Sequence, residues 1–286
     1  MKSLYCFGAC ILLLAGCIKD PQMPAPDTEP PAKPDWLLES ISVIDAISET
    51  PIFGGPMRYY KWYHEFEYDE NYKPRIRREF YGAEDTVNLA LLMVDTLHYD
   101  EQLRVKEAVT WSQRSGRVTV GKKFSYNGTD TLPATYENYG YTYPDTTNFT
   151  LQYRLSFIYD NASVRQIYAN PKGGFDTTVN VYLTGNYTHS ISPSGVRTDH
   201  YFAYDNAPNV EQFLNIDNGL IFLMPEAVAQ LPRMSLNNWT ERWDYIYGSR
   251  DRSLTYNEAG LLSSTLTINY DAVTKYMVRY TYRAVE

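Results

Sequence analysis

Catalysis by this chain would require histidines, serines, acidic residues or glycine-rich turns at particular spacings, and none of these forms a catalytic motif. The four histidines, His64, His98, His189 and His200, have no metal-ligand spacing, so we interpret each as a satisfied or exposed side chain. No nucleophile elbow of the G-x-S-x-G type and no phosphate-binding G-K-[ST] sequence occurs. The sequence therefore predicts no catalytic residue, no metal and no cofactor.

Two alternatives stay open for the acidic residues. A glycosidase needs two carboxylates that the fold brings together, so a glycan hydrolase remains an alternative function. The stretch Asn215-Ile216-Asp217-Asn218-Gly219 resembles part of a calcium loop, but it lacks the closing glutamate of an EF-hand. A solvated turn is the better interpretation of that stretch.

Clustered aromatic residues are the feature that stands out from this background. Four tyrosines crowd the stretch 128–148, where strand alternation is poor, and two tryptophans follow the longest interruption of the pattern, at 206–238. Exposed aromatic rings often form flat platforms for ligands such as sugars, and the alternative is that they pack beneath their own loop. The candidate ligand-binding residues are Tyr139, Tyr141, Tyr143, Trp239 and Trp243.

The N-terminus predicts the compartment. A basic start at Met1-Lys2 precedes an apolar segment, Leu4 to Ala15, which is too short to cross a bilayer as a helix and indicates a targeting segment. The following Leu14-Ala15-Gly16-Cys17 resembles a bacterial lipobox. The resemblance implies that residues 1–16 are a signal peptide and that Cys17 becomes a lipidated, diacylglyceryl cysteine carrying palmitate-type chains.

Residues 17–35 form the predicted tether after the signal peptide. Six prolines between Ile18 and Asp35 favour a semi-extended spacer that holds the folded part away from the membrane. Cys6 and Cys10 lie in the signal peptide and Cys17 carries lipid, so the mature chain has no free thiol for a disulfide or a nucleophile. We expect an outer-membrane lipoprotein of the bacterial cell envelope, on either face of that membrane.

Composition indicates a folded sheet protein that does not bind nucleic acid. The chain has 286 residues, of which 44% are apolar and 27 are tyrosine. Tyrosine has a high strand propensity and suits a half-buried sheet face. The net charge of −8 opposes binding to a phosphate backbone.

A short word recurs along the chain: an apolar residue, any residue, tyrosine, then Asp or Asn. The apolar residue and the tyrosine share one strand face, and the Asp or Asn accepts backbone N–H bonds in a turn. From Leu254 to Tyr282 two turns and period-two alternation predict a three-stranded meander. The hairpin words are Phe66–Asp69, Leu97–Asp100, Phe124–Asn127, Phe157–Asp160, Phe202–Asp205, Leu254–Asn257 and Ile268–Asp271.

This repeated word resembles the strand repeats called tyrosine-aspartate (RHS/YD-like) repeats. The order Tyr204–Asn209, Leu236–Asn238 and Tyr256–Leu261 is also similar to uncharacterised envelope lipoproteins of Bacteroidetes-type bacteria. The resemblance covers roughly residues 40 to 283, and Trp239 and a long apolar loop interrupt it. It implies a large antiparallel sheet in a cell-envelope lipoprotein and implies no established activity.

Residues 36–286 are therefore predicted to form a single tyrosine-rich, all-β domain. We expect about a dozen strands in a strongly twisted or barrel-like antiparallel meander. The interruption at 206–238 should cap it, with one short helical segment at Pro225–Leu231.

The preferred function is non-catalytic binding by a lipid-anchored protein, with a glycan as the first ligand to test and an outer-membrane protein as the alternative partner. A structural or assembly subunit that docks to an outer-membrane complex is the second hypothesis. The glycan hydrolase is the third.

Overall fold

The computed structural model describes residues 33–47, 58–83, 89–141, 148–160, 162–169, 173–195, 197–198, 200–210, 213, 235–244, 248–269 and 275–286. All of them belong to one unit, Lys33–Glu286. The signal peptide, Cys17 and most of the tether lie outside the described residues, as does the helical segment predicted at Pro225–Leu231. No helix among the described residues is long and apolar enough to span a membrane.

All the named elements of the described residues are strands, which confirms the all-β prediction. The sheet has 17 strands, more than the expected dozen. The strands are β1 (Trp36–Ile47), β2 (Arg58–Tyr68), β3 (Pro74–Ala83), β4 (Ala90–Tyr99), β5 (Val105–Ser112), β6 (Arg117–Ser125), β7 (Thr135–Tyr141), β8 (Phe149–Tyr159), β9 (Ser163–Ala169), β10 (Phe175–Leu183), β11 (Asn186–Ile191), β12 (Arg197–Thr198), β13 (His200–Pro208), β14 (Asn237–Asp244), β15 (Gly248–Tyr256), β16 (Leu262–Asn269) and β17 (Lys275–Ala284).

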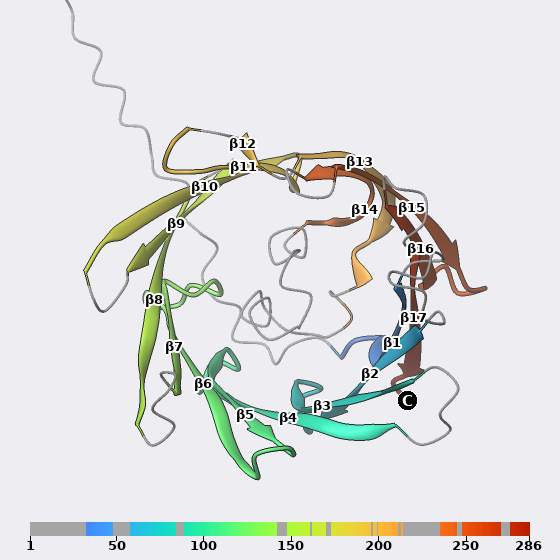
Figure 1. Cartoon of the computed structure of the whole chain (residues 1–286), viewed down its shortest axis with the longest axis horizontal. Coiled ribbons are helices and arrows are strands. Elements are labelled where there is room, and N and C mark those ends of the chain that lie inside the picture. The colour runs from blue at the N-terminus through green and yellow to red at the C-terminus, as the bar shows by residue number, and fades with distance from the viewer. Residues whose placement is uncertain are drawn as a thin grey trace, which may run out of the picture. The chain divides into compact units, whose positions relative to one another are not determined.

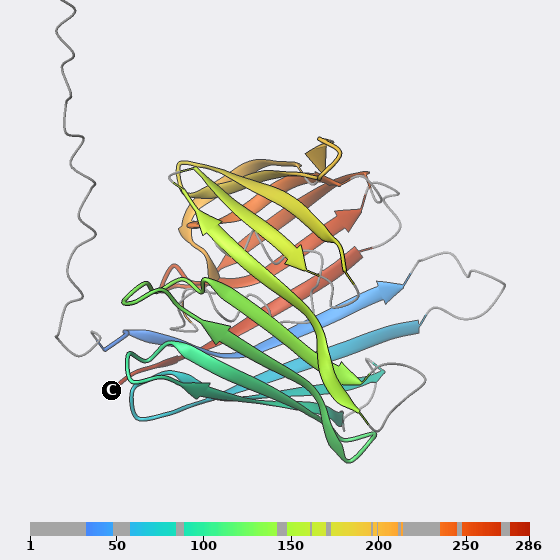
Figure 2. The same ribbon diagram turned by 90° about the vertical axis from the view of Figure 1, so that its left-hand side faces the viewer.

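The strands form a single antiparallel sheet that curls into a ring (Figure 1). Strands β1 to β11 pair in chain order, β11 pairs with β12, and β13 to β17 again pair in order. The twelve-residue strand β1 pairs with both β2 and β17, which joins the two ends of the chain's meander. Figure 2 shows the strands running obliquely around the ring. The barrel-like arrangement predicted from the sequence is confirmed.

One apolar cluster identifies the inner face of the ring. It joins buried side chains from strands on many sides of the ring, among them Ile41, Phe66, Phe124, Leu155 and Val278. Residues from strands so far apart in the pairing order can pack in one cluster only if they point to the inside. Each strand therefore has an inner, buried face and an outer face, with successive side chains alternating between them.

Two contacts are formed by the residues of the hairpin word. The Asp or Asn forms the turn contact that the sequence predicts, and the tyrosine forms a hydrogen bond that the sequence does not predict. The tyrosine of the word lies near the end of its strand, and its hydroxyl donates a hydrogen bond to a carbonyl in or near the start of a preceding strand. The pairs with this geometry are Tyr68 to Leu38, Tyr99 to Pro74, Tyr126 to Val105, Tyr159 to Pro133 and Tyr204 to Tyr187. Tyr282, which precedes no Asp or Asn, bonds to Leu262 in the same way.

The acidic or amide residue of the word organises the turn, as the sequence analysis predicts. Oδ1 of Asp69 accepts backbone N–H bonds from Asn71 and Lys73, both at 2.9 Å. The equivalent bonds form at three more turns, those of Asp100, Asp160 and Asn257. These side chains satisfy backbone donors that the strand ladder leaves unpaired.

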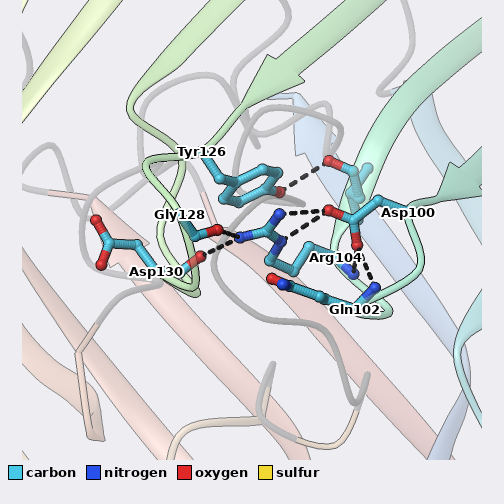
Figure 3. A network of polar contacts seen from close by, with 7 residues as sticks. Asp100, Gln102, Arg104, Tyr126, Gly128 and Asp130 are labelled. Atoms are coloured by element: carbon cyan, nitrogen blue, oxygen red, sulfur yellow. Dashed lines mark hydrogen bonds and ion pairs between the residues drawn. The ribbon is translucent and has the colours of Figure 1, made fainter. Parts of the chain in front are cut away.

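Arg104 connects two neighbouring turns at one end of the ring (Figure 3). Its guanidinium forms an ion pair with Asp100, in which Nε donates to Oδ2 at 2.8 Å. It also donates to the carbonyls of Gly128 and Asp130 at 2.8 and 2.9 Å. Burial raises the pKa of Asp100, but the hydrogen bonds from Arg104 and Gln102 outweigh burial and hold that pKa below its ordinary value.

Two sequence predictions need correction. The Tyr-, Thr- and Pro-rich stretch 128–148 is typical of a loop or a ragged hairpin, and a sequence prediction of that kind is wrong for Thr135–Tyr141, which is a strand that pairs with β6 and with β8. Its alternation is hidden because tyrosines occupy both of its faces. The brief alternation of Ile41-Ser42-Val43 predicts a short first strand, with a helical turn as an equal alternative for Asp45–Thr50, but β1 runs from Trp36 to Ile47.

A prediction for stability follows from the left-handed residue in the repeated turn. Gly260 has φ of +76°, and no atom lies within 4 Å of a Cβ added to it, so Gly260→Ala introduces backbone strain without a clash. We expect the free energy of unfolding to fall by about 1 kcal/mol, measured by denaturant unfolding. Glu258→Ala, an exposed change in the same turn, is the control and should alter stability little. Equal effects of the two changes would contradict the prediction.

Candidate functional site

The ring places three groups of chemically distinctive side chains on known faces. A charged cluster lies on the inner face of β2 to β6, an aromatic patch on the outer face of β6 to β8, and a group of arginines on the inner face of β14 and β15. The sequence analysis predicts the aromatic patch only in part and neither charged group.

The inner charged cluster is centred on Asp95, at the middle of β4. Asp95 pairs in register with Arg77 of β3 and with Thr110 of β5. Nε of Arg77 donates to Oδ2 of Asp95 at 2.6 Å, and the Thr110 hydroxyl donates to Oδ1 at 2.5 Å. Both carboxylate oxygens are therefore engaged, which is the condition for burying a charge in a sheet interior.

Glu79 and His64 extend this cluster onto β2. They are register partners, and Nδ1 of His64 lies 4.0 Å from Oε2 of Glu79. Nη2 of Arg77 lies 3.9 Å from the same oxygen. Burial raises the pKa of Glu79, the positive charge of Arg77 lowers it, and the negative charge of Asp95 raises it, with a net increase.

Lys122 of β6 completes the cluster. Burial lowers the pKa of its amine from 10.5 to about 8, with Asp95 opposing this shift and Arg77 adding to it. The cluster thus contains a carboxyl group and an amine whose pKa values are both shifted toward neutrality. The contacts described above link members of the cluster to one another, and this geometry indicates interior packing with a pH response.

The outer aromatic patch consists of Tyr139, Tyr141 and Phe149. On β7, Tyr139 and Tyr141 alternate with Tyr136 and Gly140, which are buried on the inner face. The rings of Tyr141 and Phe149 meet edge to face, with centroids 5.2 Å apart. Phe149 keeps 40% of its surface exposed.

Two cationic side chains contact the rings of this outer aromatic patch, and one glycine leaves room for them. Cζ of Arg117 lies 4.2 Å from the centroid of the Tyr141 ring, and Nζ of Lys123 lies 5.4 Å from that of Tyr139. A Cβ on Gly121 would come within 3.2 Å of the Phe149 ring, so glycine leaves the space that the ring occupies. The patch is therefore built by tertiary contacts on a rigid sheet.

A polar group borders the patch at Glu137. Oε2 of Glu137 accepts a hydrogen bond from the Tyr139 hydroxyl at 2.7 Å, and Oε1 accepts one from Nε of Arg154 at 2.8 Å. The bond from Tyr139 is the largest effect on Glu137 and lowers the pKa of its carboxyl. The same bond raises the pKa of the Tyr139 phenol.

The two tryptophans lie elsewhere. Trp239 of β14 is only 8% exposed and packs edge to face on Tyr201, whereas Trp243 is 36% exposed. A register shift opposite Trp239 in the pairing of β13 with β14 changes the alternation, which brings Trp239 to the inner face. The structure therefore brings Tyr139 and Tyr141 together but separates them from Trp239 and Trp243, since β7 and β14 lie on different sides of the ring (Figure 1). Tyr143 and Cys17 lie outside the described residues.

Several residues of these groups are not recognised from the sequence. Phe149 and Gly121 belong to the patch through pairing of β6, β7 and β8, which no local pattern encodes. Arg250 and Arg252 do carry a signal, since they alternate in step with Leu254 and Tyr256 and so share their face. Among the described residues no group of three or more His, Cys, Asp or Glu side chains is placed to hold a metal ion.

Comparison with known proteins gives similarity in structure alone. No family model matches the chain, and no curated protein matches it. A porin-like protein from Bacteroides uniformis is 11% identical, with 86% of this chain and 98% of that chain covered and a TM-score of 0.41. A porin-like protein from Bacteroides vulgatus is 9% identical, with 85% and 98% covered and a TM-score of 0.37. Nothing about the function of this chain follows from similarities at that level.

We predict that the free energy of unfolding depends on pH because of Lys122 in the charged cluster. Between pH 8 and 10.5 the unfolded chain binds more protons at this amine than the folded chain, so stability should rise with pH in that window. Lys122→Met should remove this rise, measured by denaturant unfolding at a series of pH values. Lys123→Met is the matched control because Lys123 is the next residue along β6 and is exposed on the outer face. The prediction is wrong if both variants keep the same slope.

Proposed function

We propose that the chain is a lipid-anchored cell-envelope protein that binds a carbohydrate, without catalysis, at the outer aromatic patch. The lipobox-like Leu14-Ala15-Gly16-Cys17 and the proline-rich tether support anchoring at a membrane. The tether would let the outer face of the ring meet ligands beyond the membrane surface.

The observation that carries the proposal is the construction of the patch. Tyr139, Tyr141 and Phe149 are half-buried or exposed side chains on adjacent strands, and Gly121 clears the space beneath Phe149. Aromatic rings that stay exposed on a folded surface lose the stabilisation that burial would give. A binding role explains why these rings lie on the surface. The apolar face of a sugar ring matches an aromatic surface of this kind.

Polar groups beside the rings support a carbohydrate over a purely apolar ligand. Glu137 and Arg154 form an ion pair next to Tyr139, and Arg117 lies beside Tyr141. Together they provide donors and acceptors for sugar hydroxyl groups at the rim of an apolar surface. The described contacts show no nucleophile or paired acid and base at the patch, and binding is the activity that its residues fit.

The test is binding to a panel of soluble polysaccharides, measured by affinity electrophoresis and by melting temperature. We expect at least one polysaccharide to retard the protein, and Tyr141→Ala and Phe149→Ala to weaken that binding by about tenfold, the equivalent of about 1.4 kcal/mol. Phe175→Ala is the matched control because Phe175 is an aromatic residue, 79% exposed, on β10. No retardation by any polysaccharide, or an equal loss in the control, would rule out the patch as a carbohydrate site.

A second candidate function, a structural or assembly subunit, is favoured by exposed apolar side chains on β8 and β10. Ile158, Phe175 and Leu183 are 49%, 79% and 67% exposed. Exposed apolar side chains of this size are common at contacts between proteins.

Crosslinking in intact cells separates this candidate from ligand capture. If the chain is an assembly subunit, a single membrane protein should be crosslinked in constant ratio, and the double change Phe175→Ser and Leu183→Ser should abolish that product. Tyr141→Ala should leave it unchanged. The absence of a constant partner would argue against an assembly role.

A further inference from the structure

The outer face of the ring differs from one side of the ring to the other. On β8 to β11 it is mostly apolar, whereas on β15 and β17, on the opposite side, it is polar (Figure 1). The exposed outer side chains of β15 and β17 are Asp251, Ser253, Thr255, Arg279, Thr281 and Arg283. Both parts face away from the interior, so packing of the apolar cluster does not explain the difference.

Strand β10 forms the centre of the apolar part. Asn180 and Tyr182 identify its inner face, since Asn180 has no exposed surface and Tyr182 packs against a buried cluster of aromatic rings. The alternate side chains point outward, and they are Phe175, Thr177, Val179, Val181 and Leu183. Phe175 and Leu183, at the two ends of the strand, are 79% and 67% exposed. A stripe of apolar and β-branched side chains therefore follows the outer face of the whole strand.

Strand pairing extends this stripe over the neighbouring strands. Val179 pairs in register with Arg165 of β9 and with Ile191 of β11. Arg165 also pairs with Ile158 of β8, so these four side chains form one row across four strands. The surface that we call the β8–β11 face consists of Ile158, Arg165, Ile167, Phe175, Val179, Val181, Leu183 and Ile191.

The charge of the β8–β11 face is opposite to that of the chain. Strands β8 to β11 contain one acid, Asp176, which precedes an outward position of β10 and so points to the inner face. Arg165 is exposed within the face, and Arg154 lies beside it on β8 in an ion pair with Glu137. A chain of net charge −8 thus presents an outer surface of four strands whose charged side chains are arginines.

A membrane surface fits these features better than a protein partner does. The cores of protein interfaces are rich in aromatic residues and methionine, whereas Phe175 is the one aromatic residue of the β8–β11 face. Surfaces that lie on membranes combine apolar side chains with arginine or lysine, which attract anionic lipid headgroups. The exposed residues that favour an assembly subunit belong to this same face, and its aliphatic composition and positive charge favour lipid instead.

We propose that the β8–β11 face lies on the lipid bilayer to which the chain is anchored. This orientation rests on the lipid anchor of the proposed function. A tether of residues 17–35 reaches on the order of 50 Å, so it keeps the ring close to the bilayer and gives lipid a high effective concentration at this face. Contacts too weak to hold a free protein on a membrane are then sufficient to orient a tethered one, with the polar side of β15 and β17 turned away.

The first experiment uses single added cysteines, because Cys17 is the only cysteine beyond the signal peptide. The lipidated chain with Ile158→Cys or Leu183→Cys is labelled with a fluorophore and reconstituted in vesicles of phosphatidylethanolamine and phosphatidylglycerol that contain a nitroxide-labelled lipid. Apolar side chains at a membrane surface enter the bilayer by about 5–10 Å, so the nitroxide should quench both labels. Quenching should be several-fold weaker for the control Thr255→Cys, on the outer face of β15.

A charge reversal tests the contribution of Arg165. Arg165→Glu should reduce the quenching of the label at Leu183→Cys in these anionic vesicles, and should change it little in vesicles of phosphatidylcholine, which have no net charge. Arg279→Glu is the matched control because Arg279 is an exposed arginine on the outer face of β17. It should leave the quenching unchanged in both kinds of vesicle. An equal loss in the two variants would show that the net charge of the chain causes the contact, and would overturn the proposal.

Three other results would also overturn it. The labels on the β8–β11 face are not quenched, or the label at Thr255→Cys is quenched equally. In the third, the face labels stay unquenched in vesicles while a crosslinker at Leu183→Cys captures one protein in constant ratio in cells, which assigns the face to a protein partner.

Failure of the anchor is recognised separately, from the mass of the N-terminal peptide. If Cys17 carries no lipid, the anchoring part of the proposed function is wrong. The unanchored, labelled chain is then mixed with the same vesicles and floated with them. Flotation with quenching at Ile158→Cys and Leu183→Cys supports the β8–β11 face as a membrane surface, and absence of flotation overturns it.

Discussion

The hydrogen bond from a hairpin tyrosine to the backbone of a preceding strand is the contact on which the ring depends. Tyr68, Tyr99 and Tyr126 each donate such a bond, at 2.5 to 2.8 Å, from the end of one strand to the start of the strand before it. Their rings pack against the apolar cluster at the same time. One side chain therefore satisfies a buried carbonyl, adds apolar contact and links consecutive strands. This combined role accounts for these tyrosines without reference to a ligand.

Closure of the sheet is the second constraint, and it separates the two faces. An open sheet of this many strands would expose two edges with unpaired backbone groups, and the pairing of β1 with both β2 and β17 removes this problem for β1 and β17. Once the sheet is closed, each strand position is either inside or outside. Arg77 and Asp95 must then be paired inside, whereas Tyr141 and Phe149 remain available outside.

Much of this arrangement can be predicted from the sequence, because the hairpin word is local. The alternation of Leu254, Tyr256, Leu262 and Leu266 predicts β15 and β16 correctly, and Asn257 predicts the turn between them. The strand at 135–141 is missed because tyrosines occupy both of its faces. The separation of Tyr139 from Trp239 depends on pairing across the whole ring and on one register shift in β14, and neither leaves a signal in a short segment.

The closed ring also holds charge on its inner face, and strand register decides how that charge is matched. Nε of Arg77 and the Thr110 hydroxyl both donate to the Asp95 carboxylate, so one buried charge has partners on the two neighbouring strands. The three residues meet because Asp95 pairs in register with Arg77 of β3 and with Thr110 of β5. A shift of one residue in either pairing would turn a partner to the outer face and leave the buried carboxylate without it. The register of the sheet is therefore constrained by its interior charges as well as by its apolar cluster.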